Sequence, residues 1–234
     1  MTTATATTTR TADGMRDAAL PRDPVTDRLL LAQWLSPAFP VGGFAYSQGL
    51  ETAMAAGAVR DAATLAAWTA AVVETGAART DAILLAHARR ADADLDALDA
   101  LARALAPSAE RLAETLDQGA AFGAMVAAMT GGAPPPLPYP LAVGLATRPL
   151  AVTTPEVLGL YLHGAAAVPV MAGVRFIPLG AGAGQRILAG LAPRLAALAA
   201  ALADAPLDSI ATATPRADLL AMAHETLPVR IFRS

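Results

Sequence analysis

The sequence predicts an all-α protein: a single-domain bundle of many helices with a disordered N-terminal extension. Three observations support this fold class. Apolar residues recur at spacings of three and four over most of the chain. No run of β-branched or aromatic residues alternates with polar ones over five residues or more. Asn is absent, so the chain has no Asn-Gly hairpin signal. A length of 234 residues is enough for one sizeable core.

The first part of the chain differs from the rest. Residues 1–27 are rich in Thr and Ala, carry scattered Arg, Asp and Pro, and show no apolar period. We expect a disordered extension here. A transit peptide is the alternative, but the acidic residues of this segment argue against that acid-poor class. A short apolar helix is then expected from Leu29 to Leu35, because Ser36-Pro37 stops it.

Helix starts and stops divide the remainder of the chain. Asp61 is a capping residue, and Leu65, Trp68 and Val72 after it share one helix face. Thr154-Pro155-Glu156 is a helix start, with a cap, a proline in the first turn and an early acid. The expected helices run from Ser47 to Ala56 with Gly57 as stop, from Asp61 through Val72, from Thr80-Asp81 through His87, from Leu95 to Leu105, from Ser108 to Gly131, from Thr154, along Leu188–Leu202, and from Pro215 to about Thr226.

Prolines interrupt this pattern at two places. Residues 133–138 (APPPLP) form an extended connector that is not helical. The connector could be a domain boundary, but apolar stripes on both sides favour one shared core. Pro193 lies inside the Leu188–Leu202 stripe and predicts a kink or a break in that helix.

The composition excludes several classes of function. Hydrophobic residues make up 55% and charged residues 16% of the chain, and the net charge of −3 gives no basic field for nucleic acid. Cys is absent, which excludes disulfides, thiolate nucleophiles and cysteine zinc sites, and Lys is absent, which excludes P-loop and Schiff-base lysines. His87, His163 and His224 are far apart, and we read His87 and His163 as core residues. We expect neither a resident metal nor a cofactor.

One apolar run is long enough to raise the question of a membrane span. Residues 157–174 are nearly uncharged but are interrupted by His163 and Pro169 and rich in Ala and Gly. A buried helix of the bundle fits this composition better than a membrane helix, although a membrane-associated helical protein stays open as an alternative. No N-terminal signal peptide is visible.

The most unusual stretch is residues 36–51, SPAFPVGGFAYSQGLE. Gly42-Gly43 could offer backbone N–H groups to a phosphate, but the lysine of a P-loop is missing. Ala45-Tyr46-Ser47-Gln48-Gly49 resembles a relaxed nucleophile elbow, so a serine hydrolase using Ser47 is one hypothesis; the strand that such an elbow needs is not predicted. The other interpretations are a capped helix start and a stiff turn that presents aromatic residues to a partner.

These residues also resemble a known family. SPAFPVGGFAYSQGLE is similar to the signature of the urease accessory protein F (UreF) family. Two further stretches agree in the same order: residues 174–180 (VRFIPLG) followed by Gln185, and the C-terminal residues 224–234 (HETLPVRIFRS). The resemblance covers about residues 28–234. It departs from the family pattern at Ala181 and at residues 227–229 (LPV), where Pro228 is expected to end the last helix and leave a flexible tail over about 227–234.

The resemblance implies a non-enzymatic, cytoplasmic accessory protein of urease maturation with no nucleic-acid or membrane partner. Such a protein forms a homodimer, binds the D/H accessory protein and recruits the G-type GTPase, so that nickel is delivered to apo-urease. Without this resemblance to the family, the C-terminal tail could equally be a frayed, solvent-exposed end of the chain. The residues that the resemblance places in partner binding are Pro40, Gly42, Gly43, Phe44, Tyr46, Ser47, Glu51, Arg175, Gln185, Glu225, Thr226, Arg230, Phe232, Arg233 and Ser234.

Overall fold

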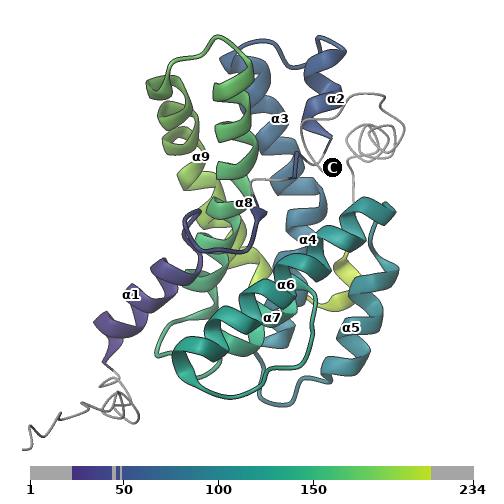
Figure 1. The fold of residues 1–234 in the computed structure, drawn as a ribbon, viewed down its shortest axis with the longest axis vertical. Helices are drawn as coiled ribbons and strands as arrows, with labels where there is room; N and C mark the ends of the chain where they lie inside the picture. The colour runs from purple at the N-terminus through teal and green to yellow at the C-terminus, as the bar shows by residue number, and fades with distance from the viewer. Residues whose placement is uncertain (1–22, 44–45, 48, 212–234) are drawn as a thin grey trace, which may run out of the picture.

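The computed structural model describes residues 23–43, 46–47 and 49–211, and within them every regular element is a helix (Figure 1). The predicted all-α fold class is therefore confirmed. The helices are α1 (Pro24–Trp34), α2 (Leu50–Ala55), α3 (Ala62–Thr75), α4 (Ala77–Ala88), α5 (Leu95–Ala104), α6 (Ala109–Thr130), α7 (Tyr139–Thr147), α8 (Thr154–Phe176) and α9 (Ala181–Leu202), followed by a 3-10 turn at Leu207–Ser209.

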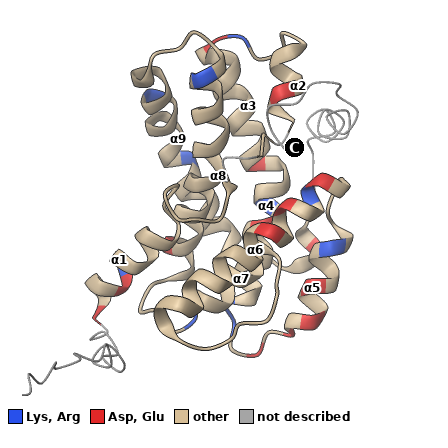
Figure 2. Cartoon of the chain, in the orientation of Figure 1, with Lys and Arg blue, Asp and Glu red and all other residues tan. Residues whose placement is uncertain are grey.

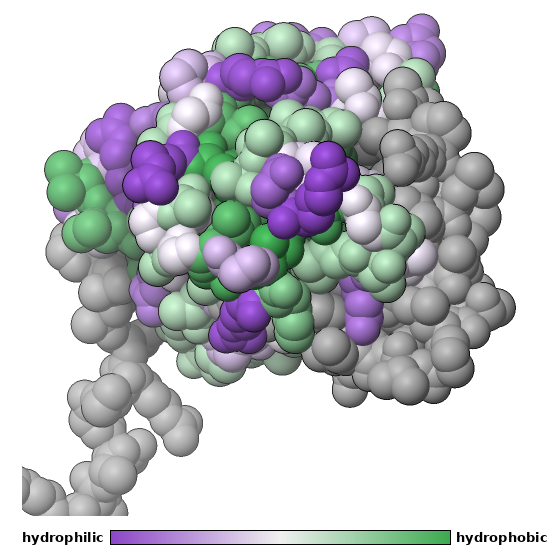
Figure 3. Space-filling view, turned by 90° about the horizontal axis from the view of Figure 1, so that it is seen from above, coloured by the Kyte–Doolittle hydropathy of each residue, from purple (hydrophilic) through white to green (hydrophobic). Residues whose placement is uncertain are grey.

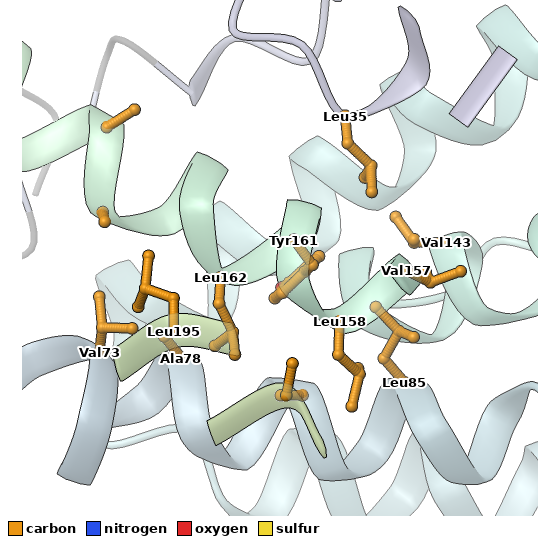
Figure 4. Packing of buried hydrophobic residues seen from close by; sticks show 14 of the residues in the cluster. Leu35, Val73, Ala78, Leu85, Val143, Val157, Leu158, Tyr161, Leu162 and Leu195 are labelled. Carbon is orange, nitrogen blue, oxygen red and sulfur yellow. The ribbon is translucent and has the colours of Figure 1, made fainter. Parts of the chain in front are cut away.

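Helix α8 occupies the middle of the molecule and packs against α9, α3 and α4. Leu158 and Leu162 of α8 are completely buried. Figure 4 shows these two side chains near Leu85 of α4 and Leu195 of α9. The apolar run that raised the question of a membrane span is thus the central helix of one hydrophobic core.

Helices α6 and α7 form a second packing unit beside α4. The proline-rich connector between them is non-helical, as predicted, and it runs along α6. Gly119 makes this contact possible, since a Cβ at that position would lie 2.0 Å from the carbonyl oxygen of Leu137. The connector therefore closes the core and does not separate two cores.

Local capping signals place several helix starts where the sequence predicts them. The carboxylate of Asp61 accepts the N–H of Thr64, whose hydroxyl in turn accepts the N–H of Asp61, which makes a capping box. Ser108 caps α6 through the N–H of Arg111. The start predicted at Thr154 is also found, although the capping side chain belongs to Thr153. Gly57, with φ of 69°, ends α2 as expected.

Three predicted boundaries are wrong. Helix α1 begins at Pro24, before the boundary expected at residue 28, because the Asp23 side chain caps it by accepting from Val25 and Thr26. Helix α2 begins at Leu50 and not at Ser47, since the preceding Gly49 has a left-handed φ of 79°. Helix α4 begins at Ala77, which places Asp81 inside the helix and not at its start.

Two further helices depart from the sequence reading. The sequence predicts a kink or a break at Pro193; helix α9 continues through this residue, so a break does not occur. Helix α7 had no counterpart among the expected helices. It consists of nine uncharged residues (YPLAVGLAT), most of them buried. Because it is apolar on every side, it lacks the polar face that makes a helix recognisable in a sequence. The helix expected over 215–226 lies outside the described residues.

The tryptophans and histidines differ in burial. Trp34 is buried and Trp68 is half-buried against the core. His87 is half-buried, and its Nε2 lies 2.9 Å from the carbonyl oxygen of Ala205. His163 is exposed on α8, so the prediction that it is a core residue is wrong. The described residues contain no cluster of three or more His, Cys, Asp or Glu that could hold a metal ion.

The surface carries little charge. Figure 2 shows charged residues on α5 and α6, whereas α7 has none. On the upper face (Figure 3), apolar side chains are mixed with single hydrophilic ones. Two described helices, Thr154–Phe176 and Ala181–Leu202, are long and apolar enough to span a membrane. For the first, 56% of the apolar window is buried in the bundle, as expected for a core helix, and for the second 28% is buried.

Candidate functional site

We call the segment between α1 and α2 the signature loop (residues 36–49). Its described part, residues 36–43, 46–47 and 49, consists mainly of turns. The hydroxyl of Ser36 accepts the N–H of Ala38 at 3.1 Å, and the carbonyl of Ser36 accepts the N–H of Phe39 at 2.9 Å. Gly42 has φ of 74°, a left-handed conformation that L residues with side chains rarely adopt. The turn at Gly42 therefore requires a glycine, because a residue with a side chain would be strained in this conformation.

Two aromatic side chains fix this loop to the body of the protein. Phe39 is 7% exposed, and its ring centroid lies 5.5 Å from that of Phe122 on α6. Tyr46 is 5% exposed, and its hydroxyl donates a hydrogen bond to Oδ2 of Asp117 at 3.3 Å. Both rings are therefore used within the chain, one in the apolar core and one at a polar edge of α6.

Ser47 does not have the geometry of a nucleophile elbow. Its side chain is 1% exposed, and its Oγ accepts the N–H of Glu51 at 3.4 Å. The described residues before it form turns and contain no strand, whereas an elbow places an exposed serine at the end of a strand. The hydrolase hypothesis therefore lacks its geometric basis, and Ser47 is better understood as a residue that supports the first turn of α2.

A cavity of about 90 Å³ lies beneath the signature loop. It is lined by the loop, by the end of α1 and by residues of α4, α6, α7 and α8. The lining combines apolar residues with a group of polar ones. The polar side chains of this lining, apart from Ser36, are those of Asp81, Arg111, Glu114, Gln118, Tyr139 and Tyr161.

Most of these polar side chains are bonded to one another. Nη2 of Arg111 lies 2.5 Å from Oδ2 of Asp81, which also accepts the hydroxyl of Tyr161 at 3.0 Å. Nη1 of Arg111 lies 3.3 Å from Oε2 of Glu114. Nε2 of Gln118 donates to Oε1 of Glu114 at 3.0 Å. We call Asp81, Arg111, Glu114, Gln118 and Tyr161 the polar cluster.

Burial and the charges of neighbouring groups together shift the pKa values of the residues in this cluster. Burial raises the pKa of Asp81 above its usual value, and the charge of Arg111 and the hydroxyl of Tyr161 partly offset that effect. For Arg111, burial alone would lower the pKa, but the attraction of Asp81 and Glu114 outweighs it, so the pKa rises and the guanidinium stays charged. Burial, followed by the charge of Asp81, raises the pKa of Tyr139 and Tyr161, so both phenols stay neutral.

The structure brings only part of the predicted partner-binding set together. Pro40 and Gly42 are exposed in the loop, Gly43 and Glu51 are half-buried, and Tyr46 and Ser47 are buried. Phe44 and the C-terminal residues Glu225, Thr226, Arg230, Phe232, Arg233 and Ser234 lie outside the described residues.

The two remaining predicted residues lie near the junction of α8 and α9. Arg175 is exposed near the end of α8, one turn after Met171, which lines the cavity. Gln185 is exposed near the start of α9.

Sequence reasoning missed the polar cluster. The sequence pattern predicts Asp81 at a helix start and does not distinguish the other members from ordinary helix residues. One signal was available in α6, because Arg111, Glu114 and Gln118 follow each other at spacings of three and four and so share a helix face. The partners of that face on α4 and α8 depend on tertiary packing.

These features define an all-helical protein whose most specific feature is a shaped surface loop held over an internally bonded polar cluster. A family model described as UreF matches residues 59–192. A "Urease accessory protein UreF" of Cereibacter sphaeroides strain ATH 2.4.1 is 58% identical over 206 residues, covering 88% of this chain and 98% of the relative. Proteins of the same name from Paracoccus denitrificans Pd 1222 (53% over 211 residues, 90% and 98% covered) and Jannaschia sp. CCS1 (50% over 220 residues, 94% and 100%) are similar. The chain belongs to the UreF family of urease accessory proteins.

Proposed function

We propose that this protein is a non-enzymatic scaffold of urease maturation. In this role it binds the D/H accessory protein and the G-type GTPase at the same time, and it regulates the GTP-dependent delivery of nickel to apo-urease. Family membership supports the general role, and the resemblance of the signature loop and the C-terminal motif supports the choice of partners. We further propose that it acts in the cytoplasm as a homodimer.

The observation that carries this proposal is the construction of the signature loop. Pro40 and Gly42 are exposed at its outer side, while Phe39 and Tyr46 hold it from below. An exposed turn that is anchored by two buried aromatic residues suits recognition by another protein, because it loses less conformational entropy on binding than an unanchored loop. Most of the described polar side chains that line the cavity beneath it are bonded to one another, which fits a structural role.

The composition is consistent with a complex in which GTP hydrolysis and nickel binding are not functions of this chain. Since the chain has no Lys, it has no P-loop lysine, and GTP hydrolysis would be supplied by the GTPase partner. Since it has no Cys and only three His, nickel would be a cargo of the assembly and not a resident ion of this chain.

Co-purification tests the proposal directly. The chain is expressed with the D/H accessory protein and the GTPase of the same organism, and the eluted complex is sized by light scattering. A single complex that contains all three proteins, with two copies of this chain, is the expected result. A well-folded chain that elutes alone in the presence of folded partners would contradict the proposal.

A truncation tests the assignment of the C-terminal residues. Removal of Arg230–Ser234 should leave the helical spectrum and the thermal midpoint unchanged and weaken capture of the D/H partner. Normal capture by the truncated chain would remove these residues from the partner-binding set. In the same preparation, a fluorophosphonate probe should leave Ser47 unlabelled, and labelling there would revive the hydrolase hypothesis.

A further inference from the structure

The cavity of about 90 Å³ beside the signature loop has the features of a small binding pocket. Pro37 of the loop and Met171 of α8 both line it and are exposed, so the cavity reaches the surface at these two residues. Leu35, Val41 and Val168 add apolar surface to its lining. One water molecule needs about 10–15 Å³ of such space, so the cavity has room for several waters or for one small ligand.

Three polar groups of the lining have hydrogen-bonding capacity that the described part of the chain does not use. The hydroxyl of Tyr139 makes no hydrogen bond with a described residue, although that of Tyr161 beside it is bonded to Asp81. Gln118 donates to Glu114 through Nε2, but its Oε1 accepts no hydrogen bond from a described residue. Oδ1 of Asp81 accepts none from the described residues either, since both bonds of this carboxylate go to Oδ2. Polar groups that face away from bulk water usually have a partner, so these three can serve a ligand.

The charges around the cavity favour an uncharged ligand. Arg111 is bonded to Asp81 and also lies 3.3 Å from Glu114, so that one guanidinium is shared by two carboxylates. An added cation would be repelled by Arg111, and an added anion would be repelled by the two carboxylates. Moving an ion out of water into such a pocket also carries a large desolvation cost. We therefore expect a neutral ligand that both donates and accepts hydrogen bonds.

We propose that this cavity binds a carboxamide, namely the side chain of a glutamine or an asparagine of a partner protein. The amide nitrogen of that side chain finds acceptors in Gln118 and Asp81, and its carbonyl oxygen can accept the hydroxyl of Tyr139. The bonds within the polar cluster hold these groups in place before binding, which reduces the entropy lost in the complex. The identity of the partner rests on the proposed scaffold function, whereas the affinity of the cavity for an amide does not.

A titration of the full-length chain with propionamide, which has the end group of a glutamine side chain, tests the chemistry of the cavity. Methionine methyl signals are followed by NMR, because Met171 lines the cavity and Met129, which is exposed on α6, does not. We expect a saturable shift of the Met171 signal and no shift of the Met129 signal. Methyl ethyl ketone has a similar size and a carbonyl oxygen but no N–H group, and it should bind about tenfold more weakly.

Tyr139→Phe is the most informative variant, because it removes only the unused hydroxyl and keeps the ring contacts with Phe122 and Tyr161. It should leave the thermal midpoint unchanged and weaken both propionamide binding and capture of the D/H partner about fivefold. Ala165→Met adds side-chain volume to the cavity from α8 and should abolish the propionamide shift. Asp99→Asn, which removes a surface ion pair on α5, is the control and should change none of these measurements.

The possible outcomes separate the claims. A Met171 signal that does not move with propionamide would overturn the proposal and leave the cavity as a site for water only. Equal binding of methyl ethyl ketone, or undiminished binding of propionamide to Tyr139→Phe, would exclude a hydrogen-bonded amide. If Tyr139→Phe binds propionamide more weakly but captures the D/H partner normally, the side chain of that partner does not occupy the cavity. If the wild-type chain captures no partner, the scaffold function fails, and the titration alone decides whether the cavity binds an amide.

Discussion

The contact between Gly119 and the proline-rich connector leads to a quantitative prediction about stability. A Cβ at this position would lie 2.0 Å from the carbonyl oxygen of Leu137, 2.8 Å from the nitrogen of Tyr139 and 2.9 Å from the carbonyl carbon of Pro138. All three neighbours are backbone atoms, which cannot rotate away as the end of a side chain can. In Gly119→Ala the connector must therefore move off α6.

The expected cost follows from three contributions. Inserting a methyl group into a packed contact costs about 1–3 kcal/mol. Movement of the connector also breaks the hydrogen bond from the N–H of Tyr139 to Oγ1 of Thr115, which is worth about 1 kcal/mol. Alanine in a helix interior recovers about 0.5–1 kcal/mol. The net loss is about 2 kcal/mol, which corresponds to a decrease of about 4–8 °C in Tm for a chain of this size.

Urea unfolding followed by circular dichroism, at one fixed protein concentration, measures this difference. Gly190→Ala is a matched control, because Gly190 also lies inside a long helix but has nothing within 4 Å of an added Cβ. We expect this control to gain about 0.5–1 kcal/mol. A Gly119→Ala protein that is as stable as the wild type would refute the close contact. An equal loss in Gly190→Ala would show that the cost is not specific to the connector.

Three further predictions concern the polar cluster and the helix starts. Arg111→Met should lose about 3–5 kcal/mol in urea unfolding, because it leaves Asp81 without its buried cation; wild-type stability would show that the pair is unimportant. Ser108→Ala should lose about 1 kcal/mol in the same assay through the missing cap of α6, and no loss would contradict that cap. The N–H of Thr153, followed by Arg28, lowers the pKa of Glu156 to about 2, so its contribution is complete above the unfolded pKa and is lost as the pH falls toward 2. The stability difference between wild type and Glu156→Gln should therefore shrink from pH 6 to pH 2, and a constant difference would exclude this linkage.

The parts of the fold that the sequence predicts correctly depend on neighbours along the chain. Asp61 and Ser108 cap their helices through bonds to residues three positions later, and Gly57 ends α2 by its own backbone conformation. The true starts of α1 and α2 also have local causes, namely the Asp23 cap and the left-handed Gly49. In the sequence, however, the apolar pattern beside each of them is the stronger signal, so the predicted starts are wrong. Helix α7 could not be found, because a helix of uncharged, mostly buried residues shows no polar face.

The candidate site also has one part that the sequence predicts and one part that it does not. The signature loop is recognisable as a continuous motif of prolines, glycines and aromatic residues. The polar cluster beneath it is not, because its bonds join Asp81 to residues 30 and 80 positions further along the chain. Nothing in the local pattern of α4 distinguishes Asp81 from a helix-capping acid, and only the packing of α4, α6 and α8 shows its partner.

The presence of this cluster in so apolar a chain bears on its role. Charged residues make up 16% of the sequence, yet Asp81, Arg111 and Glu114 lie together around one cavity. Buried ion pairs are often no more stabilising than apolar residues of the same volume, so stability alone does not account for them. Directional bonds hold a side chain in one position, which apolar contacts do less well. The bonds that run from Asp81 through Arg111 and Glu114 to Gln118 therefore hold the polar side chains that line the cavity beside the signature loop in one arrangement.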